Sequence, residues 1–167
     1  MDRDFQSRGN AVLCRHVLAV LLLVAGANVV ALARDLALVS NKANSVTDVS
    51  MPDLVKICKG QTNHWPKGKP VTLFTRNPAS PEMKLALEKI YALSKDEVND
   101  VIATANHGRA NHPAIIVVDS DQELVESVAS TPGAVGLVDV YSITGAITVL
   151  RVDGKLPLEA GYPLHAN

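Results

Sequence analysis

The sequence predicts an α/β sandwich in which helices pack on a central sheet. Short runs rich in β-branched and other apolar residues alternate repeatedly with segments whose apolar residues have helical spacing. Serine, proline and glycine residues stand where the helical segments begin and end. With 167 residues, the chain has the length of one domain plus a targeting segment.

The N-terminal region, residues 1–33, has the features of a secretory signal. Basic residues precede a charge-free apolar run, and this run ends in a small-x-small sequence: Arg3, Arg8 and Arg15, then Val17 to Val30, then Ala31-Leu32-Ala33. The apolar run is too short to cross a bilayer comfortably. We therefore predict a cleaved signal peptide over 1–33 and a periplasmic or secreted domain over 34–167. An uncleaved membrane anchor is the alternative.

Charge and cysteine content exclude several classes of protein. The formal net charge is −1, which argues against a nucleic-acid-binding protein and against a polybasic membrane surface. Of the two cysteines, Cys14 lies in the predicted signal, so the exported domain has no internal disulfide. Cys58 follows Leu54 by four residues on an apolar helix face, and this spacing predicts a buried structural thiol.

The first strand and helix are predicted over residues 35–40 and 51–59. The strand, DLALVS, is almost wholly apolar, and a polar loop follows over 41–48. Ser50 can cap the helix, Pro52 lies in its first turn, and Gly60 ends it. The segment after Gly60 contains Trp65 and several prolines and glycines, which is typical of a turn-rich connection.

A strand over 71–76, a sharp loop and a helix over 81–91 form the centre of the predicted domain. Residues 77–79 turn the chain, Ser80 can cap the helix, and Pro81 suits its first turn. The helix start therefore lies beside Arg76 and a hydroxyl, which is the composition of an anion site. The alternative is an ordinary capped helix in which Arg76 is solvated.

The second half continues the alternation. Capping boxes at Ser94–Glu97 and Ser120–Glu123 predict two more helices. Between these helices a loop over 106–112 leads into a buried strand over 113–118, and residues 131–133 end the later helix. Another buried strand is predicted over 134–141, and weak alternation over 147–152 ends at the turn signal Asp153-Gly154. The tail from Lys155 has no clear pattern.

The residue types do not form a catalytic or metal-binding constellation. The histidines His64, His107, His112 and His165 lack the spacing of metal ligands, and no nucleophile elbow or phosphate-binding P-loop motif occurs. Asp119 and Asp121 are interpreted as acids at a helix start. We therefore predict no enzyme activity, no metal and no cofactor.

Two segments together resemble a known family. Residues 37–76 contain a strand, a helix ending in a glycine-to-tryptophan turn, and a strand ending in Arg76; residues 119–140 contain a helix followed by TPGAVGL. In this order they resemble the second lobe of the phosphate-binding proteins of ABC transporters, whose corresponding motif is TPGAIGY. The resemblance implies a single lobe of the type 2 periplasmic-binding-protein fold, a three-layer sandwich with a central mixed sheet.

The family's ligand residues carry over only in part. Its loop after the strand arginine has the form R-x-x-S-G-T, whereas this chain has RNPASPE, in which Arg76 and Ser80 match and Glu82 adds a negative charge. The resemblance implies ligand-binding residues Arg76, Asn77, Ser80, Asp139 and Tyr141. For Asp139 and Tyr141, the alternative is a strand-end acid and a packing aromatic.

The leading hypothesis is an exported substrate-binding domain that binds phosphate or a similar small anion for ABC-type transport. The expected partners are a transporter permease or another envelope protein, and a second copy of the chain or a partner chain could close over the open site. The second hypothesis is an interaction module of the cell envelope that keeps the fold of such a lobe and has lost the ligand.

Overall fold

The computed structural model describes residues 34–66 and 68–166, so the predicted signal peptide lies outside the described residues. The predicted α/β class with a central mixed sheet is confirmed. Five strands form the sheet in the order β4-β3-β5-β1-β6. Their bounds are β1 Leu36–Ser40, β3 Thr72–Arg76, β4 Ile115–Val118, β5 Ala134–Asp139 and β6 Thr148–Val149.

The sheet is mixed because the first strand runs against its neighbours. β3 pairs in parallel with both β4 and β5, whereas β1 is antiparallel to β5 and β6. Residue Leu36 at the start of β1 therefore lies opposite Asp139 at the end of β5. The carboxyl ends of β3, β4 and β5 and the beginning of β1 meet at one edge of the sheet.

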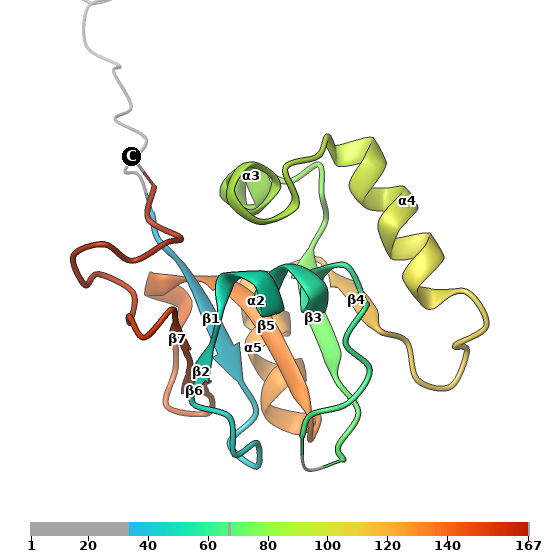
Figure 1. Ribbon diagram of the computed structural model, residues 1–167, viewed down its shortest axis with the longest axis horizontal. Helices are drawn as coiled ribbons and strands as arrows, with labels where there is room; N and C mark the ends of the chain where they lie inside the picture. The colour runs from blue at the N-terminus through green and yellow to red at the C-terminus, as the bar shows by residue number, and fades with distance from the viewer. Residues whose placement is uncertain (1–33, 67, 167) are drawn as a thin grey trace, which may run out of the picture. The chain divides into compact units, whose positions relative to one another are not determined.

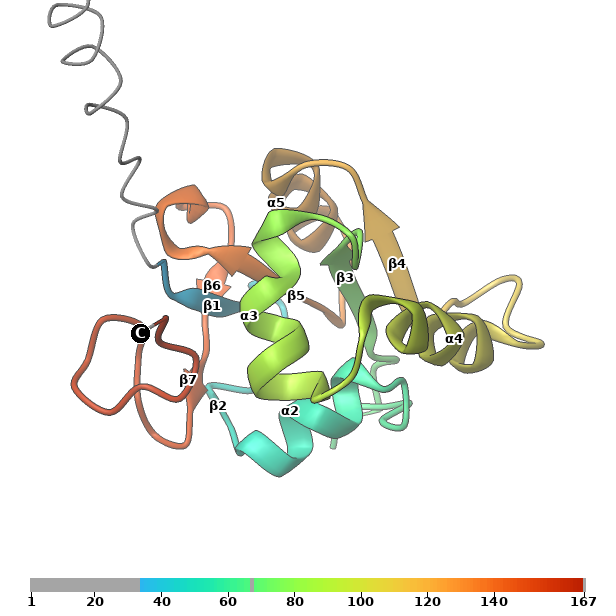
Figure 2. The same ribbon diagram turned by 90° about the horizontal axis from the view of Figure 1, so that it is seen from above.

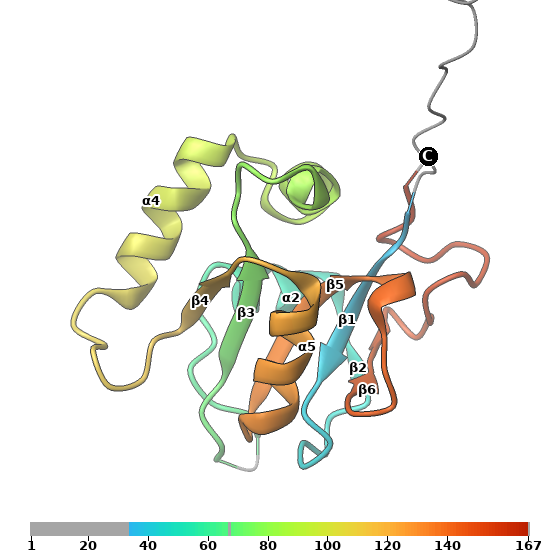
Figure 3. The ribbon, with the colours of Figure 1, turned by 180° about the vertical axis from the view of Figure 1, so that it is seen from behind.

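Helices cover both faces of the sheet, which gives three layers. α2 (Met51–Cys58) lies on one face, and α5 (Asp121–Ser130) covers the other (Figures 1 and 3). The helical segment over 81–91 lies beyond the carboxyl ends of the strands and packs its buried side chains into the same core as α2. Each face of the sheet has its own apolar core: the first core lies on the α2 side and the second core on the α5 side. Alternation along β1 directs Leu36 and Leu38 toward the first core, and Ala37 and Val39 toward the second. α4 (Lys95–Asn106) contributes the fully buried Val98 to the first core.

The helix predicted over 81–91 is not uniform. It begins as a 3₁₀ turn over Pro81–Met83, continues as α3 (Lys84–Ala86), and ends as a π-turn over Leu87–Tyr91. The left-handed Ala92, with φ of 51°, then stops it. The wider final turn allows the consecutive residues Ile90 and Tyr91 both to be buried.

The weak alternation over 147–152 corresponds to two short strands. β6 joins the main sheet beside β1, whereas β7 (Arg151–Val152) pairs in parallel with β2 (Asp48–Val49). The buried Leu150 between them marks the point where the chain changes sheets. The prediction missed β2 because a strand of two residues is too short to show alternation.

One further prediction concerns the buried cysteine. Cys58 is a free, fully buried cysteine, as its helical spacing predicted. Across residues 34–66 and 68–166, none of the helices combines the length and the apolar character that a membrane crossing requires.

Candidate functional site

The site is built at the edge of the sheet where β3 and β5 end and β1 begins. Arg76 is the last residue of β3, Asp139 is the last residue of β5, and Arg34 precedes β1. Figure 2 shows this edge from above, with the helical segment over 81–91 passing across it. Clefts at the carboxyl ends of parallel strands are the usual ligand sites of open α/β sheets.

Arg76 is held by an acidic residue from another element. Its Nη1 atom lies 2.7 Å from Oδ1 of Asp121, and the two side chains are 15% and 16% exposed. The hydroxyl of Ser142 donates to Oδ2 of the same Asp121 carboxylate at 3.1 Å. The alternative in which Arg76 is solvated is therefore wrong, because Asp121 pairs with its guanidinium.

Ser80 lies at the start of the 3₁₀ turn, but its hydroxyl does not cap the helix. The backbone N–H of Met83 donates to the Ser80 carbonyl at 3.1 Å instead, as the tight first turn requires. The predicted cap is therefore wrong. The Ser80 Oγ and the Arg76 Nε are buried and have no hydrogen-bond partner among the described residues.

Glu82 brings a negative charge to the same loop. Its Oε2 atom lies 3.8 Å from Nη2 of Arg76. The pKa of Glu82 lies below its ordinary value, mainly because its own backbone N–H donates to the carboxylate. The nearby Ser80 hydroxyl and the charges of Arg76 and Arg34 add to this effect, although Ser80 does not reach good hydrogen-bond geometry.

Asn77 shapes the loop between Arg76 and Ser80. Its Oδ1 atom accepts from the backbone N–H of Ala79 at 2.9 Å, and its carbonyl accepts from that of Ser80 at 2.8 Å. This arrangement is an Asx-type turn. Asn77 is exposed at this edge of the sheet, and its side-chain oxygen is already hydrogen-bonded within the loop.

Asp139 and Tyr141 lie together at the end of β5. The Asp139 carboxylate accepts from the backbone N–H of Tyr141 at 2.8 Å, and this bond starts a 3₁₀ turn over Val140–Ser142. The predicted strand therefore ends at Asp139, before Tyr141. The Tyr141 ring is 75% exposed, so the interpretation as a packing aromatic is wrong.

Arg34 is a residue of this edge that sequence reasoning missed. Its Nη1 atom lies 3.2 Å from Oδ2 of Asp139, and its guanidinium lies 5.9 Å from the centroid of the Tyr141 ring. The sequence offered one signal: Arg34 directly precedes the first strand. Its meaning depends on the antiparallel pairing of β1 with β5, which periodicity does not reveal.

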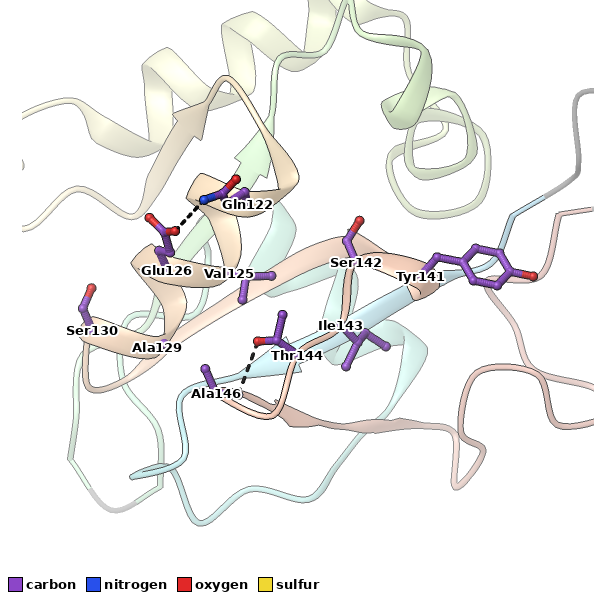
Figure 4. A pocket seen from close by; sticks show the side chains of 10 residues that line it. All are labelled: Gln122, Val125, Glu126, Ala129, Ser130, Tyr141, Ser142, Ile143, Thr144 and Ala146. Carbon is purple, nitrogen blue, oxygen red and sulfur yellow. Dashed lines mark hydrogen bonds between the residues drawn. The ribbon is translucent and has the colours of Figure 1, made fainter.

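An open groove of about 860 Å³ borders the site between α5 and the chain after β5 (Figure 4). Ser142 connects the two, since its side chain lines the groove and its hydroxyl bonds Asp121. Gln122 donates to Glu126 at 2.9 Å along one wall. The lining residues are Gln122, Val125, Glu126, Ala129, Ser130, Tyr141, Ser142, Ile143, Thr144 and Ala146.

The site offers charge and hydroxyls but no metal cluster. Within the described residues, histidine, cysteine and acidic side chains nowhere gather in a group of three or more that could hold a metal ion. His165 instead bonds the buried Asp35 through Nδ1 at 2.6 Å. Arg76, Ser80 and Arg34 bring two guanidinium groups and a hydroxyl to this edge, which are donor types from which polar and anionic groups accept hydrogen bonds.

Several solved structures share the fold of this chain. An ABC-type phosphate transport receptor from Vibrio cholerae matches with a TM-score of 0.65 at 20% identity, covering 80% of this chain and 54% of the receptor. PstS from Borrelia burgdorferi matches with a TM-score of 0.61 at 18% identity, covering 80% of this chain and 55% of PstS. A phosphate-binding protein from Stenotrophomonas maltophilia has a TM-score of 0.55 at 20% identity, with coverages of 75% and 40%.

This chain therefore matches about half the length of the first two structures, and the likeness shows a shared fold. No curated protein matches the chain. The resemblance to phosphate-binding proteins of ABC transporters, drawn from the two sequence segments, is confirmed by these structures. Residues 26–163 match the family described as the PBP superfamily domain, and the chain belongs to that superfamily.

Proposed function

We propose that this domain binds phosphate or a similarly small oxyanion at the sheet edge, as a substrate-binding component of ABC-type transport. The observation that carries the proposal is a pair of buried polar atoms that have no hydrogen-bond partner among the described residues: Nε of Arg76 at the end of β3 and Oγ of Ser80 in the loop that follows. A buried donor without a partner costs about 1–3 kcal/mol, so such atoms favour a bound acceptor. A tetrahedral oxyanion accepts from an arginine N–H and a hydroxyl at the same time.

The charges around the site limit the expected affinity. Asp121 and Glu82 place two carboxylates beside the single guanidinium of Arg76, which disfavours a dianion. The Arg76 side chain is 15% exposed, so an anion bound to it stays in partial contact with water, where salt screens its charge. We therefore expect weak binding by the isolated domain and tighter binding when a second surface closes over the edge.

The proposal includes export and a transporter partner. The signal-like residues 1–33 would direct the domain to the periplasm or the outside of the cell, with cleavage before Arg34. The solved structures it resembles include an ABC-type phosphate transport receptor. A permease of that class is the partner that such a receptor would meet, and the domain itself would carry out no chemical reaction.

A thermal-shift titration with phosphate, sulfate and molybdate tests the proposal. Phosphate should raise the melting temperature of the wild type in a saturable way, and Arg76→Ala and Ser80→Ala should each reduce that increase. Arg151→Ala is the control, because it removes an arginine that pairs with Glu159 on the C-terminal segment. If phosphate at millimolar concentration leaves the wild type unchanged, the binding proposal fails.

A second candidate function is an interaction module that binds a protein and no anion. The Arg76–Asp121 ion pair favours it, since an internal carboxylate already occupies the arginine that an anion would use. This candidate predicts a folded protein that is indifferent to all three anions. The same titration therefore separates the two functions.

A further inference from the structure

Two exposed apolar side chains lie on either side of the start of β1. Tyr141 is 75% exposed and Leu158 is 69% exposed, and the described residues contain one other large apolar side chain that is exposed, Val117. The chain segments that carry Tyr141 and Leu158 both bond Asp35: the Val140 N–H donates to its carbonyl at 3.1 Å, and the Leu158 N–H donates to its Oδ2 at 3.0 Å. Figure 2 shows the two segments flanking β1.

Leu158 is exposed and has a strained backbone conformation. Its φ is 69°, a left-handed conformation that residues other than glycine rarely adopt. The carboxylate of Asp35, which is only 2% exposed, fixes this conformation by accepting the Leu158 N–H. A strained residue that a buried carboxyl group holds in place, with its apolar side chain in water, favours a contact surface over a chance exposure.

The segment behind Leu158 is fixed to the fold, so the side chain is displayed on a rigid support. The Tyr162 hydroxyl donates to the Leu36 carbonyl at 2.8 Å, and the Leu36 N–H donates to the carbonyl of the fully buried Leu164 at 3.1 Å. Rigid anchors favour association because little conformational entropy is lost when they are covered.

The same surface reaches the candidate anion site and carries charges of both signs. Arg34 lies against the Tyr141 ring and is 59% exposed. Glu82 is 42% exposed and lies 3.8 Å from Arg76. We name the four residues Arg34, Glu82, Tyr141 and Leu158 the edge surface.

We propose that the edge surface is an interface between two copies of this chain, related by a two-fold axis, with Tyr141 and Leu158 as its apolar anchors. In such an interface the same patch meets itself, so each exposed charge needs an opposite charge on the same patch. Arg34 and Glu82 supply that complementarity, and the second copy closes over Arg76 and Ser80. The closure of the anion site rests on the proposed function, whereas the interface does not.

Sedimentation equilibrium of the purified protein, in the form that the producing cell makes, tests the interface. The wild type should dimerise with a dissociation constant between about 1 μM and 1 mM, the range of modest interfaces. Tyr141→Ser and Leu158→Ser should each raise that constant about tenfold or more, as expected for anchors in an interface. Val117→Ser is the matched control, because it removes an exposed apolar side chain at β4 and should leave the constant within about twofold.

The outcomes separate the interface from the proposed function. A monomer throughout the concentration range overturns the interface, and so does a dimer that Val117→Ser weakens as much as Tyr141→Ser does. If phosphate tightens the wild-type dimer and Arg76→Ala abolishes that effect, the second copy closes the anion site. If the dimer depends on Tyr141 and Leu158 but does not respond to phosphate, the interface is supported and the closure of the anion site by the second copy is overturned. Unchanged melting temperatures of the serine variants exclude unfolding as the cause.

Discussion

Arg76 at the end of β3 is joined to Asp121 in the first turn of α5, with 2.7 Å between Nη1 and Oδ1. This ion pair links the strand at the candidate site to the helix on the opposite face of the sheet. It also places an internal carboxylate on one side of the guanidinium, whereas Nε has no hydrogen-bond partner within residues 34–66 and 68–166. The site thus combines an arginine whose charge is balanced by Asp121 with an Nε–H group that can still donate a hydrogen bond.

Removing the Asp121 charge should increase anion affinity and decrease stability. Asp121→Asn keeps the shape of the side chain, and it leaves the positive charge of Arg76 available to phosphate. We expect phosphate to bind about tenfold more tightly, by the usual size of a nearby like-charge effect. The free energy of unfolding should fall by about 2–3 kcal/mol, because a partly buried arginine loses its charged partner.

Calorimetric titration and urea denaturation of Asp121→Asn measure the two effects. Asp119→Asn is the control, since Asp119 is exposed and its backbone N–H, not its carboxylate, bonds Glu123. Equal phosphate affinity in Asp121→Asn and the wild type would show that Asp121 does not compete with the ligand.

Gly133 should tolerate no side chain. It has φ of 93°, and an added Cβ would lie 2.1 Å from the carbonyl oxygen of Pro70. Its own carbonyl accepts the indole N–H of Trp65 at 2.8 Å, so a shift here also disturbs the loop before β3. Gly133→Ala should lower the free energy of unfolding by about 2–4 kcal/mol.

The matched control is Gly145→Ala, where a Cβ would meet nothing within 4 Å and φ is not positive. Its effect in the same urea denaturation should stay within about 0.5 kcal/mol. Similar losses in both variants would contradict the explanation by the close approach to Pro70.

Asn41 should be required at the end of α5. Its Nδ2 group donates to the carbonyls of Val128 at 2.9 Å and Ala129 at 2.8 Å, in the last turn of the helix. Asn41→Asp keeps the shape, loses both donors and puts a negative charge at a helix C-terminus. We expect thermal and urea denaturation to show a loss of about 2–4 kcal/mol.

Asn111→Asp, which makes the same change at an exposed loop position, should have little effect on stability. A loss at Asn41 no greater than at Asn111 would mean that the two hydrogen bonds to α5 are not formed in solution.

Stability should decline in alkaline solution because of Cys58. Burial raises the pKa of this thiol to about 12, and the Tyr91 hydroxyl, which donates to the Cys58 carbonyl, also has a raised pKa because of burial. In the unfolded chain the thiol loses its proton near its ordinary pKa of about 8.5. Above that pH the unfolded state binds fewer protons than the folded state, so the free energy of unfolding falls as pH rises.

Chemical denaturation from about pH 8 to pH 11 measures this decline, and Cys58→Ala should reduce it. In the native protein the thiol should also react with iodoacetamide far more slowly than in the denatured chain. Rapid labelling of the native protein at about pH 8 would contradict the burial of Cys58.

The sequence predicted the elements whose signals are local. The helical spacing of Leu54 and Cys58 and the reciprocal capping box of Ser94 and Glu97 appear as predicted. The second predicted capping box is only half present: Ser120 accepts from the Glu123 N–H, but the Glu123 carboxylate bonds the N–H of Asp119. One-sided caps of this kind have the same sequence signature as reciprocal ones.

The parts of the site that depend on the packing of distant elements could not be predicted. Asp121 has the sequence position of a helix-start acid, and only the packing of α5 against the sheet brings it to Arg76. Arg34 becomes part of the edge because β1 is antiparallel to β5. In both cases the partner is more than 40 residues away along the chain, so no local pattern carries the information.

The most direct test of the central claim is an NMR titration that follows the Nε–H resonance of Arg76 as phosphate is added. If the anion binds at the free donors, this resonance and the backbone amide of Ser80 should shift together and saturate, and the Nε–H resonance of Arg151 should not move. If the Arg76 and Ser80 resonances stay unchanged while the protein remains folded, the edge of the sheet is not an anion site.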